Sequence, residues 1–363
     1  MLHPLHGADP STVARIVRGA GPIPVRGWVT LAAVAASTVA RRPVDLAEHL
    51  YVRHRLRRHG TLPSPVFIVG HWRSGTTHLY NMLGLSPDLA FVTPFATGMP
   101  WSFMLLERTA GPLLERLLPQ ERYVDAVRVN AEAPQEDEIG LANMTTPSFY
   151  HGVYFPRRFA REMRRGIFFD GCGDGEIRAW QDRLRLFVDK VSLDFGGHPA
   201  LVKNPAHTAK IDRLLEIWPD ARFIHIVRNP FHVYQSTRRF FLSLLDLLAL
   251  QPYDAVEVEE VFTDTYSRMM ARLIDAASRL PPDRFVEVRY EDVERDPRGE
   301  VARIVRQLDL CDPDRLDERV SAYLEATAGY SKSTREVPDD VAERVGRVWR
   351  PFVEHWNYAP VAG

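Results

Sequence analysis

The residues with the clearest chemical meaning form one short turn, Gly70-His-Trp-Arg-Ser-Gly75-Thr76-Thr77. The spacing matches the phosphate-binding loop whose backbone N–H groups cradle phosphate oxygens, except that Thr76 stands where that loop carries lysine. In nucleoside-triphosphate enzymes this lysine contacts the β- and γ-phosphates, so its replacement argues against ATP or GTP hydrolysis. The backbone amides and the positive end of the following helix still favour a phosphate-like group, and Arg73 adds a cation.

A second cationic position ends another apolar segment. Phe223 to Val227 has the pattern of a buried strand, and Arg228 follows it where a magnesium-dependent enzyme would carry an acidic residue. A guanidinium there indicates a phosphate held directly by protein rather than through a metal. Ser236 lies eight residues after Arg228. On a helix that spacing is about two turns, so a helix that passes the ligand brings both side chains to it.

These two motifs resemble those of the sulfotransferases that use 3′-phosphoadenosine 5′-phosphosulfate (PAPS), most closely the bacterial branch related to tyrosylprotein and carbohydrate sulfotransferases. The resemblance implies a sulfuryl transfer from PAPS, as co-substrate, to an acceptor hydroxyl group, with no metal. In that family the first motif binds the 5′-phosphosulfate, and the later Arg and Ser bind the 3′-phosphate. The residues that it implies for cofactor binding are Arg73, Ser74, Gly75, Thr76, Thr77, His78, Arg228 and Ser236.

Lys203 is the candidate for the cation at the reacting group. It ends the apolar run Leu201-Val-Lys203, and the resemblance implies that it contacts the bridging oxygen or the leaving 5′-phosphate. The alternative is a solvated strand end. Fixed cations and N–H groups suit this reaction, because they stabilise charge that develops on the leaving phosphate.

Several groups compete for the role of general base, which accepts the proton of the acceptor hydroxyl. Glu136 is the first choice, in an acidic cluster that is expected to open a helix, and Glu138 in the same cluster is second. His207 is the runner-up from the family resemblance, although it follows Lys203 by four residues rather than two. His71 and His151 are weaker candidates. Each of these residues also has an ordinary structural interpretation, and the residues alone leave the choice open.

The alternation of apolar runs and helical segments predicts an α/β fold. We expect a P-loop-type parallel sheet flanked by helices, with a helical insertion that covers the carboxyl edge of the sheet. Apolar runs predict strands at 65–70, which we expect at the centre of the sheet, and at 199–203, 221–228 and 284–290. Asp296 is the expected N-cap of the helix after the last strand. The expected segments are an N-terminal helical part, 1–60, and a P-loop domain, 61–363, with the insertion at 94–195.

Composition restricts the partners and the cellular location. The formal charge of -1, from 46 basic and 47 acidic residues, makes nucleic acid an improbable partner. Two cysteines exclude a disulfide framework, so a cytoplasmic protein is expected. The apolar stretch Trp28 to Ala40 is shorter than the roughly 20 residues of a membrane span. It is expected to be a buried or surface-lying helix, and peripheral membrane contact by it or by Phe240 to Leu250 stays open.

The acceptor is a small molecule, a lipid or a glycan, and the sequence does not choose among them. Two other functions stay open, a small-molecule kinase with a degenerate P-loop and a non-catalytic nucleotide-binding protein. Residues 329–333 are a further candidate, to close over the 3′ side of the nucleotide. Aromatic and apolar residues of the insertion are expected either to line an acceptor cleft or to form the core of that segment. They are Trp101, Phe103, Met104, Phe149, Tyr150, Tyr154 and Phe155.

Overall fold

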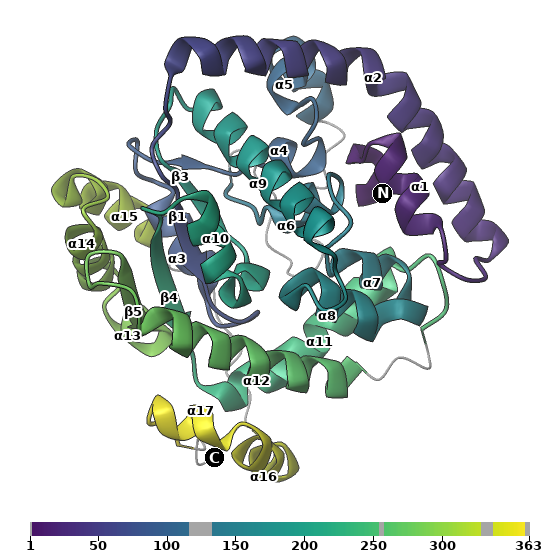
Figure 1. The fold of residues 1–363 in the computed structure, drawn as a ribbon. Helices are drawn as coiled ribbons and strands as arrows, with labels where there is room; N and C mark the ends of the chain where they lie inside the picture. The colour runs from purple at the N-terminus through teal and green to yellow at the C-terminus, as the bar shows by residue number, and fades with distance from the viewer. Residues whose placement is uncertain (1, 116–132, 254–257, 328–336, 360–363) are drawn as a thin grey trace. The chain divides into compact units, whose positions relative to one another are not determined.

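The computed structural model describes residues 2–115, 133–253, 258–327 and 337–359 (Figure 1). The chain divides into two compact units. The first unit comprises residues 1–65, 90–202 and 241–258, and the second comprises 66–89, 203–240 and 259–363. The segments 1–60, 61–363 and 94–195 that the sequence suggests stay predictions.

The described part of the chain forms a five-stranded sheet with the order β2-β3-β1-β4-β5. Parallel pairing joins β1 to β4, β2 to β3, and β4 to β5. The strands are β1 Val66–Val69, β2 Ala90–Phe91, β3 Ala200–Lys203, β4 Arg222–Val227 and β5 Phe285–Arg289. The parallel α/β sheet and the central place of β1 are confirmed. The short edge strand β2 was not predicted, because two residues carry no periodicity.

The register of the strands brings the chemically interesting residues together at one edge of the second unit. Val69 pairs with His225, and Val227 pairs with Arg289. Because the strands are parallel, the chain that leaves β1 at Gly70 passes the end of β4, and Arg228 lies beside Tyr290, the first residue after β5. β1 is buried along its whole length, as expected for a strand covered on both faces.

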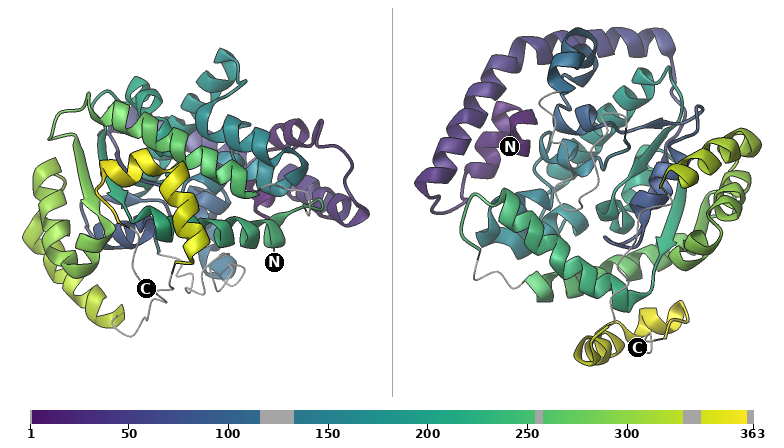
Figure 2. Two further views of the ribbon diagram at one scale, coloured as in Figure 1. Left: turned by 90° about the horizontal axis from the view of Figure 1, so that it is seen from below. Right: turned by 180° about the vertical axis from the view of Figure 1, so that it is seen from behind.

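Helices follow each strand of the second unit, as Figure 2 shows from two further directions. They are α3 Thr76–Leu83, η3 Pro205–Ala209, α10 Ile211–Ile217, α11 Pro230–Leu248, α12 Val258–Ala277, α13 Tyr290–Arg295, α14 Pro297–Leu308, α15 Pro313–Thr327, α16 Asp339–Val348 and α17 Arg350–His355. Asp296 caps α14, because its carboxylate accepts a hydrogen bond from the N–H of Gly299 at 2.9 Å. The prediction that this is the first helix after β5 was wrong, since α13 precedes it directly.

The first unit is helical apart from β2 and β3. Its helices are η1 Pro4–Gly7, α1 Pro10–Val17, α2 Val25–His59, α4 Pro94–Gly98, α5 Phe103–Glu115, α6 Glu138–Ala142, α7 Tyr150–Tyr154, η2 Pro156–Arg158, α8 Phe159–Phe168 and α9 Asp174–Asp194. The 35-residue helix α2 packs on η1, α1, α5 and α9. None of the described helices combines the length and the apolar character that crossing a bilayer requires.

Candidate active site

The loop after β1 has a backbone that only particular residues allow. Gly70, Arg73 and Gly75 have φ values of 144°, 70° and 100°, in the left-handed region that disfavours ordinary side chains. A Cβ atom on Gly70 would lie 2.6 Å from the carbonyl oxygen of Ile226, and one on Gly75 would lie 2.3 Å from the ring of Tyr290. Both glycines are therefore required by close approach as well as by dihedral angle. The loop is a tight backbone turn held between neighbouring strand ends.

Helix α3 presents its N-terminus at this turn. Gly75 is the N-cap, and no side chain among the described residues caps the first turn, so the N–H groups of Thr76 and Thr77 lack the usual capping partner there. The hydroxyl of Ser74 is buried and has no hydrogen-bond partner among the described residues. A buried unsatisfied hydroxyl beside uncapped N–H groups is the arrangement that a phosphate or sulfate oxygen completes. The residues present therefore fit an anionic group at this position.

Arg73, Arg228 and Ser236 meet at the same turn, although they come from two separate motifs. The Nε of Arg73 donates to the hydroxyl of Ser236 at 2.9 Å. The guanidinium of Arg228 donates to the backbone oxygen of Arg73 at 3.2 Å. The two guanidinium groups thus belong to one cluster within the second unit. Burial and the nearby Arg228 also lower the pKa of His232, which keeps this histidine neutral beside the cations.

Tyr290 holds the guanidinium of Arg228 from the other side. The Cζ of Arg228 lies 4.2 Å from the centroid of the Tyr290 ring, within cation–π range. The same ring closes on Gly75. One aromatic side chain therefore fixes both the cation and the turn, which explains why the residue after β5 contributes to a site that begins after β1.

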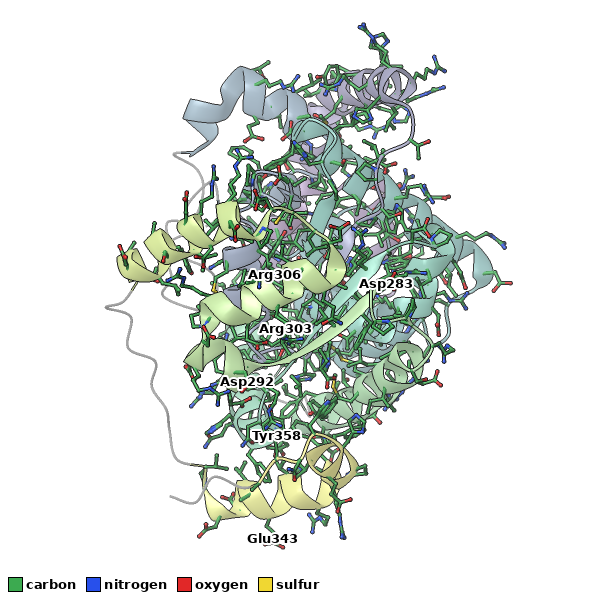
Figure 3. The ribbon with its side chains drawn as sticks, turned by 90° about the vertical axis from the view of Figure 1, so that its left-hand side faces the viewer. Asp283, Asp292, Arg303, Arg306, Glu343 and Tyr358 are labelled. Atoms are coloured by element: carbon green, nitrogen blue, oxygen red, sulfur yellow. The ribbon has the colours of Figure 1, made fainter. Side chains whose placement is uncertain are left out.

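Glu291 fixes the backbone that follows Arg228. Its carboxylate accepts hydrogen bonds from the N–H of Asn229 at 2.9 Å and from the hydroxyl of Tyr358 at 2.7 Å. Tyr358 and Asp292 are labelled in Figure 3. Burial, followed by the bond to Glu291, raises the pKa of the Tyr358 phenol, so it stays a proton donor. The end of β4 is thus tied to both α13 and the C-terminal part of the chain.

Lys203 lies within hydrogen-bond distance of the loop helix. Its ammonium group donates to the hydroxyl of Thr77 at 3.1 Å, and the side chain is 3% exposed. The interpretation as a solvated strand end therefore fails, because the side chain is buried at the turn. The site thus combines two guanidinium groups, one ammonium group, hydroxyls and helix N–H groups around one loop, a set matched to an anion with several oxygens. His78 lies half-buried on α3.

His207 and His71 are both buried in the second unit. His207, in η3, is fully buried with its ring centroid 5.6 Å from that of Phe67. His71 packs against Trp72, Tyr266 and Trp349, and burial lowers its pKa to about 3. A base with so low a pKa stays neutral near pH 7 but accepts protons poorly. His71 therefore has a packing role, and the role of His207 as general base stays a prediction.

The remaining base candidates lie in the first unit. α6 begins at Glu138, so Glu136 precedes the helix rather than sharing it, and its backbone oxygen accepts a bond from the hydroxyl of Thr97 at 2.9 Å. Glu138 is buried and accepts from the hydroxyl of Ser148 at 2.7 Å. The ring nitrogens of His151 each lie 2.9 Å from a carbonyl oxygen, a structural arrangement. Glu136, half-buried, stays the predicted base.

The sequence analysis did not predict the contact of Thr208 with the loop, and it predicted that of Tyr290 only in part. The hydroxyl of Thr208 accepts from the N–H of Gly70 at 2.8 Å and donates to its carbonyl at 3.1 Å. Nothing in its spacing from the loop signals this contact. Tyr290 belongs to a segment that the family resemblance included, yet its stacking on Arg228 follows only from the register. The candidate lid at 329–333 lies outside the described residues.

The aromatic residues of the insertion form the core of the first unit. Phe103, Met104, Phe149, Tyr150, Tyr154 and Phe155 are all buried, and Trp101 is half-buried. The rings of Phe149 and Tyr150 stack, with centroids 4.7 Å apart. Of the two interpretations that the sequence left open, core packing is the one that these side chains fulfil.

Comparison with known proteins places this chain in a family. A model described as the sulfotransferase family matches residues 65–314. The omega-hydroxy-beta-dihydromenaquinone-9 sulfotransferase Stf3 of Mycobacterium bovis is 31% identical over 294 residues, which is 81% of this chain and 75% of that protein. The Mycobacterium tuberculosis Stf3 gives the same values. The chain belongs to the sulfotransferase family. It is therefore a transferase, and the kinase and the non-catalytic alternatives no longer apply.

Solved sulfotransferases share the fold. STF9 from Mycobacterium avium has a TM-score of 0.68 at 16% identity and covers 97% of both chains. STF1 from Mycobacterium tuberculosis has a TM-score of 0.58 at 17% identity, over 92% of this chain and 89% of that one. These likenesses confirm the predicted fold class, a P-loop-type sheet flanked by helices.

Proposed function

We propose that this sulfotransferase transfers the sulfuryl group of PAPS to a hydroxyl group of a lipid-soluble acceptor, without a metal ion. The observation that carries the proposal is the cluster of Arg73, Arg228 and Ser236 at the turn that begins with Gly70. Two guanidinium groups and a hydroxyl from separate motifs meet where a nucleotide with phosphates at two positions needs them. The Stf3 relatives are named as sulfotransferases of a hydroxylated menaquinone, which supports a lipid acceptor.

The residues divide the work between binding and transfer. Ser74, Thr76 and Thr77 bind the 5′-phosphosulfate with their N–H groups and hydroxyls, and Arg228 with Ser236 binds the 3′-phosphate. In the reaction the acceptor oxygen attacks sulfur, the bond from sulfur to the bridging oxygen breaks, and the electron pair stays on the 5′-phosphate. Lys203 stabilises that leaving charge, because its ammonium group lies at the same loop.

The hydroxyl proton passes to a carboxylate or imidazole, for which Glu136 and His207 are the candidates. Glu136 is half-buried, so its carboxylate is more accessible to an acceptor than His207, which is fully buried against Phe67. We favour Glu136 for this reason. The protein is proposed to act in the cytoplasm, where PAPS is available as a soluble co-substrate.

Transfer of labelled sulfate tests this function. The full chain is incubated in EDTA with PAPS labelled in the sulfate and with menaquinone-type lipids that carry or lack a terminal hydroxyl group. We expect label only in the hydroxylated lipid, and far less of it with the variant Lys203→Ala. Label in a water-soluble phenol or sugar but not in the lipid overturns the acceptor class, and a requirement for Mg²⁺ overturns the metal-free mechanism.

A further inference from the structure

Helix α2 carries an exposed apolar stripe that the reaction does not use. In the described part of the chain, six of the eight large apolar side chains that are exposed lie on this helix. They are between 53% and 80% exposed. We name them the outer stripe of α2: Val25, Trp28, Val29, Val39, Leu46 and Leu50. At about 100° per residue they lie within an arc of about 100°, and they extend over about 38 Å of helix.

Small apolar residues fill the same arc between the large ones. Five exposed residues lie within about 20° of the arc of the outer stripe: Ala32, Ala35, Ala36, Pro43 and Ala47. The stripe therefore runs from Val25 to Leu50 without a polar side chain. Scattered exposed apolar residues are normal on a protein surface, but a continuous stripe of this length marks an interaction surface.

The opposite face of α2 is fixed to the first unit by its acidic residues. Glu48 is buried, accepts a hydrogen bond from the N–H of Leu105 at 2.8 Å and lies 2.5 Å from the ammonium group of Lys190. Asp45 is buried and pairs at 3.0 Å with Arg41 of the same helix, whose guanidinium group donates to the backbone oxygens of Gly7 and Ala8 at 3.0 and 2.6 Å. These contacts set the rotation of the helix, so the outer stripe faces away from the unit's core.

The exposed charges on α2 are all positive. Asp45 and Glu48 are the helix's only acidic residues, and both are buried. Arg53 and Arg57 continue the outer stripe beyond Leu50, at the same angular position, and both are exposed. A helix with an apolar face and only cationic exposed charges is typical of a segment that lies in the interface of an anionic bilayer. A second copy of α2 would offer these arginines no acidic partner.

A basic hollow borders the outer stripe. It is lined by Arg15, Arg42 and Arg183, with Trp101 and Asp9 among its other lining residues. The guanidinium of Arg183 lies 4.9 Å from the ring centroid of Trp101. Asp9 caps α1 by accepting from Ser11 and Thr12, so the three arginines are in excess and suit the phosphate of a lipid head group. Arg42 belongs to α2 itself.

We propose that α2 is a membrane-docking helix, which lays its outer stripe on an anionic phospholipid surface and directs Arg53, Arg57 and Arg42 to lipid head groups. The docked protein takes its acceptor from the bilayer in which a lipid-soluble molecule dissolves. Docking itself does not rest on sulfuryl transfer, because it is measured without PAPS.

Vesicle binding by the full chain tests the surface. The probes are phosphatidylcholine vesicles with and without about one third phosphatidylglycerol, at low and high salt. We expect flotation with the anionic vesicles, weakened at least about tenfold by Leu46→Glu and by Arg53→Glu/Arg57→Glu, since each charge near the surface contributes about fivefold. High salt should weaken binding as well. The controls are Leu2→Glu and Arg306→Glu, which change an exposed leucine and an exposed α14 arginine (Figure 3) outside the stripe.

The fluorescence of Trp28 gives a second readout on the unmodified chain. Of the seven tryptophans, Trp28 is exposed, Trp101 is half-buried and the other five are buried. We expect brominated lipid tails to quench part of the emission in the wild type and none in Trp28→Phe. Absence of flotation, equal binding of the stripe variants and the wild type, or a dimer in solution that Leu46→Glu dissociates without any vesicle binding would overturn the proposal.

Discussion

The arginines at the loop after β1 and those beside the outer stripe of α2 differ in their surroundings. Around the loop, Arg73 and Arg228 are half-buried and contact defined partners, a hydroxyl, a backbone oxygen and an aromatic ring. Along α2, Arg53 and Arg57 are exposed and follow an apolar face. The first arrangement fixes each guanidinium group through several contacts at a backbone turn, whereas the second leaves both guanidinium groups exposed to solvent. Local packing, rather than residue type, therefore distinguishes the two arrangements.

The largest expected effect is on transfer, at Lys203. Lys203→Ala removes the buried ammonium group that bonds to Thr77, and we expect kcat to fall about 10² to 10³-fold. Affinity for 3′,5′-bisphosphoadenosine should change far less, since the arginines remain. Steady-state kinetics measures the change in kcat, and calorimetric titration measures the change in nucleotide affinity. Vesicle binding should be unaffected. An equal loss of nucleotide affinity and of kcat would make Lys203 a binding residue instead.

Gly75→Ala should break the loop while leaving α2 intact. The new Cβ would meet the ring of Tyr290 at 2.3 Å at a φ of 100°, so we expect a loss of about 2 to 4 kcal/mol in the free energy of unfolding. Gly346→Ala is the matched control, because nothing lies within 4 Å of its Cβ position in α16. It should be neutral or stabilising by up to about 1 kcal/mol. Urea denaturation measures both, and similar losses would show that the loop is less constrained than its backbone indicates.

Arg228→Ala should weaken binding of 3′,5′-bisphosphoadenosine by about 2 kcal/mol, through loss of a charge-assisted contact. Tyr290→Leu removes the stacking partner but keeps the charge, and the expected loss is about 1 kcal/mol. Isothermal titration checks both values. Arg306→Ala, on α14, is the control for the loss of one positive charge. If Arg228→Ala retains the wild-type affinity, the assignment of the 3′-phosphate site to this residue is wrong.

The prediction with the smallest effect at neutral pH concerns acid stability. His71 is fully buried, and its pKa is lowered from 6.5 to about 3, so the unfolded chain binds the extra proton between these values. Its contribution to stability is complete above pH 6.5 and is lost as the pH falls toward 3, at up to about 1.4 kcal/mol per pH unit. His71→Gln should flatten this dependence in urea titrations at pH 7, 5 and 4. The exposed His54→Gln should follow the wild type, and a His71→Gln variant that also does so would contradict the assignment.

Local pattern located residues that the structure brings together at the loop after β1. An apolar run ending in glycine located β1, and two fixed spacings located Arg73, Arg228 and Ser236, because the chemistry of a strand end depends on few neighbouring residues. Contacts between residues of different strands could not be predicted from the sequence. The stacking of Tyr290 on Arg228 and the hydrogen bonds between Thr208 and Gly70 depend on strand register and packing. Strand β2 and helix α13 were missed because each is too short to show a period.

The α2 region shows the other limit of the sequence. Its apolar stretch from Trp28 to Ala40 predicts a helix that is either buried or on the surface. The choice depends on Asp45 and Glu48, whose burial turns the other face outward. The spacing of residues does not predict that rotation, because it depends on contacts with other elements, such as Lys190 of α9 with Glu48 and Arg41 of α2 with the backbone oxygen of Gly7.

The central claim is that the loop after β1, together with Arg228 and Ser236, binds both ends of a single adenosine nucleotide through protein groups alone. Calorimetric titration in EDTA with 3′,5′-bisphosphoadenosine and with adenosine 5′-phosphate tests it most directly. The account predicts one molecule bound per chain and a marked preference for the bisphosphate, which Arg228→Ala and Ser236→Ala both reduce. Equal affinity for the two nucleotides, or binding that appears only when Mg²⁺ is added, would contradict it.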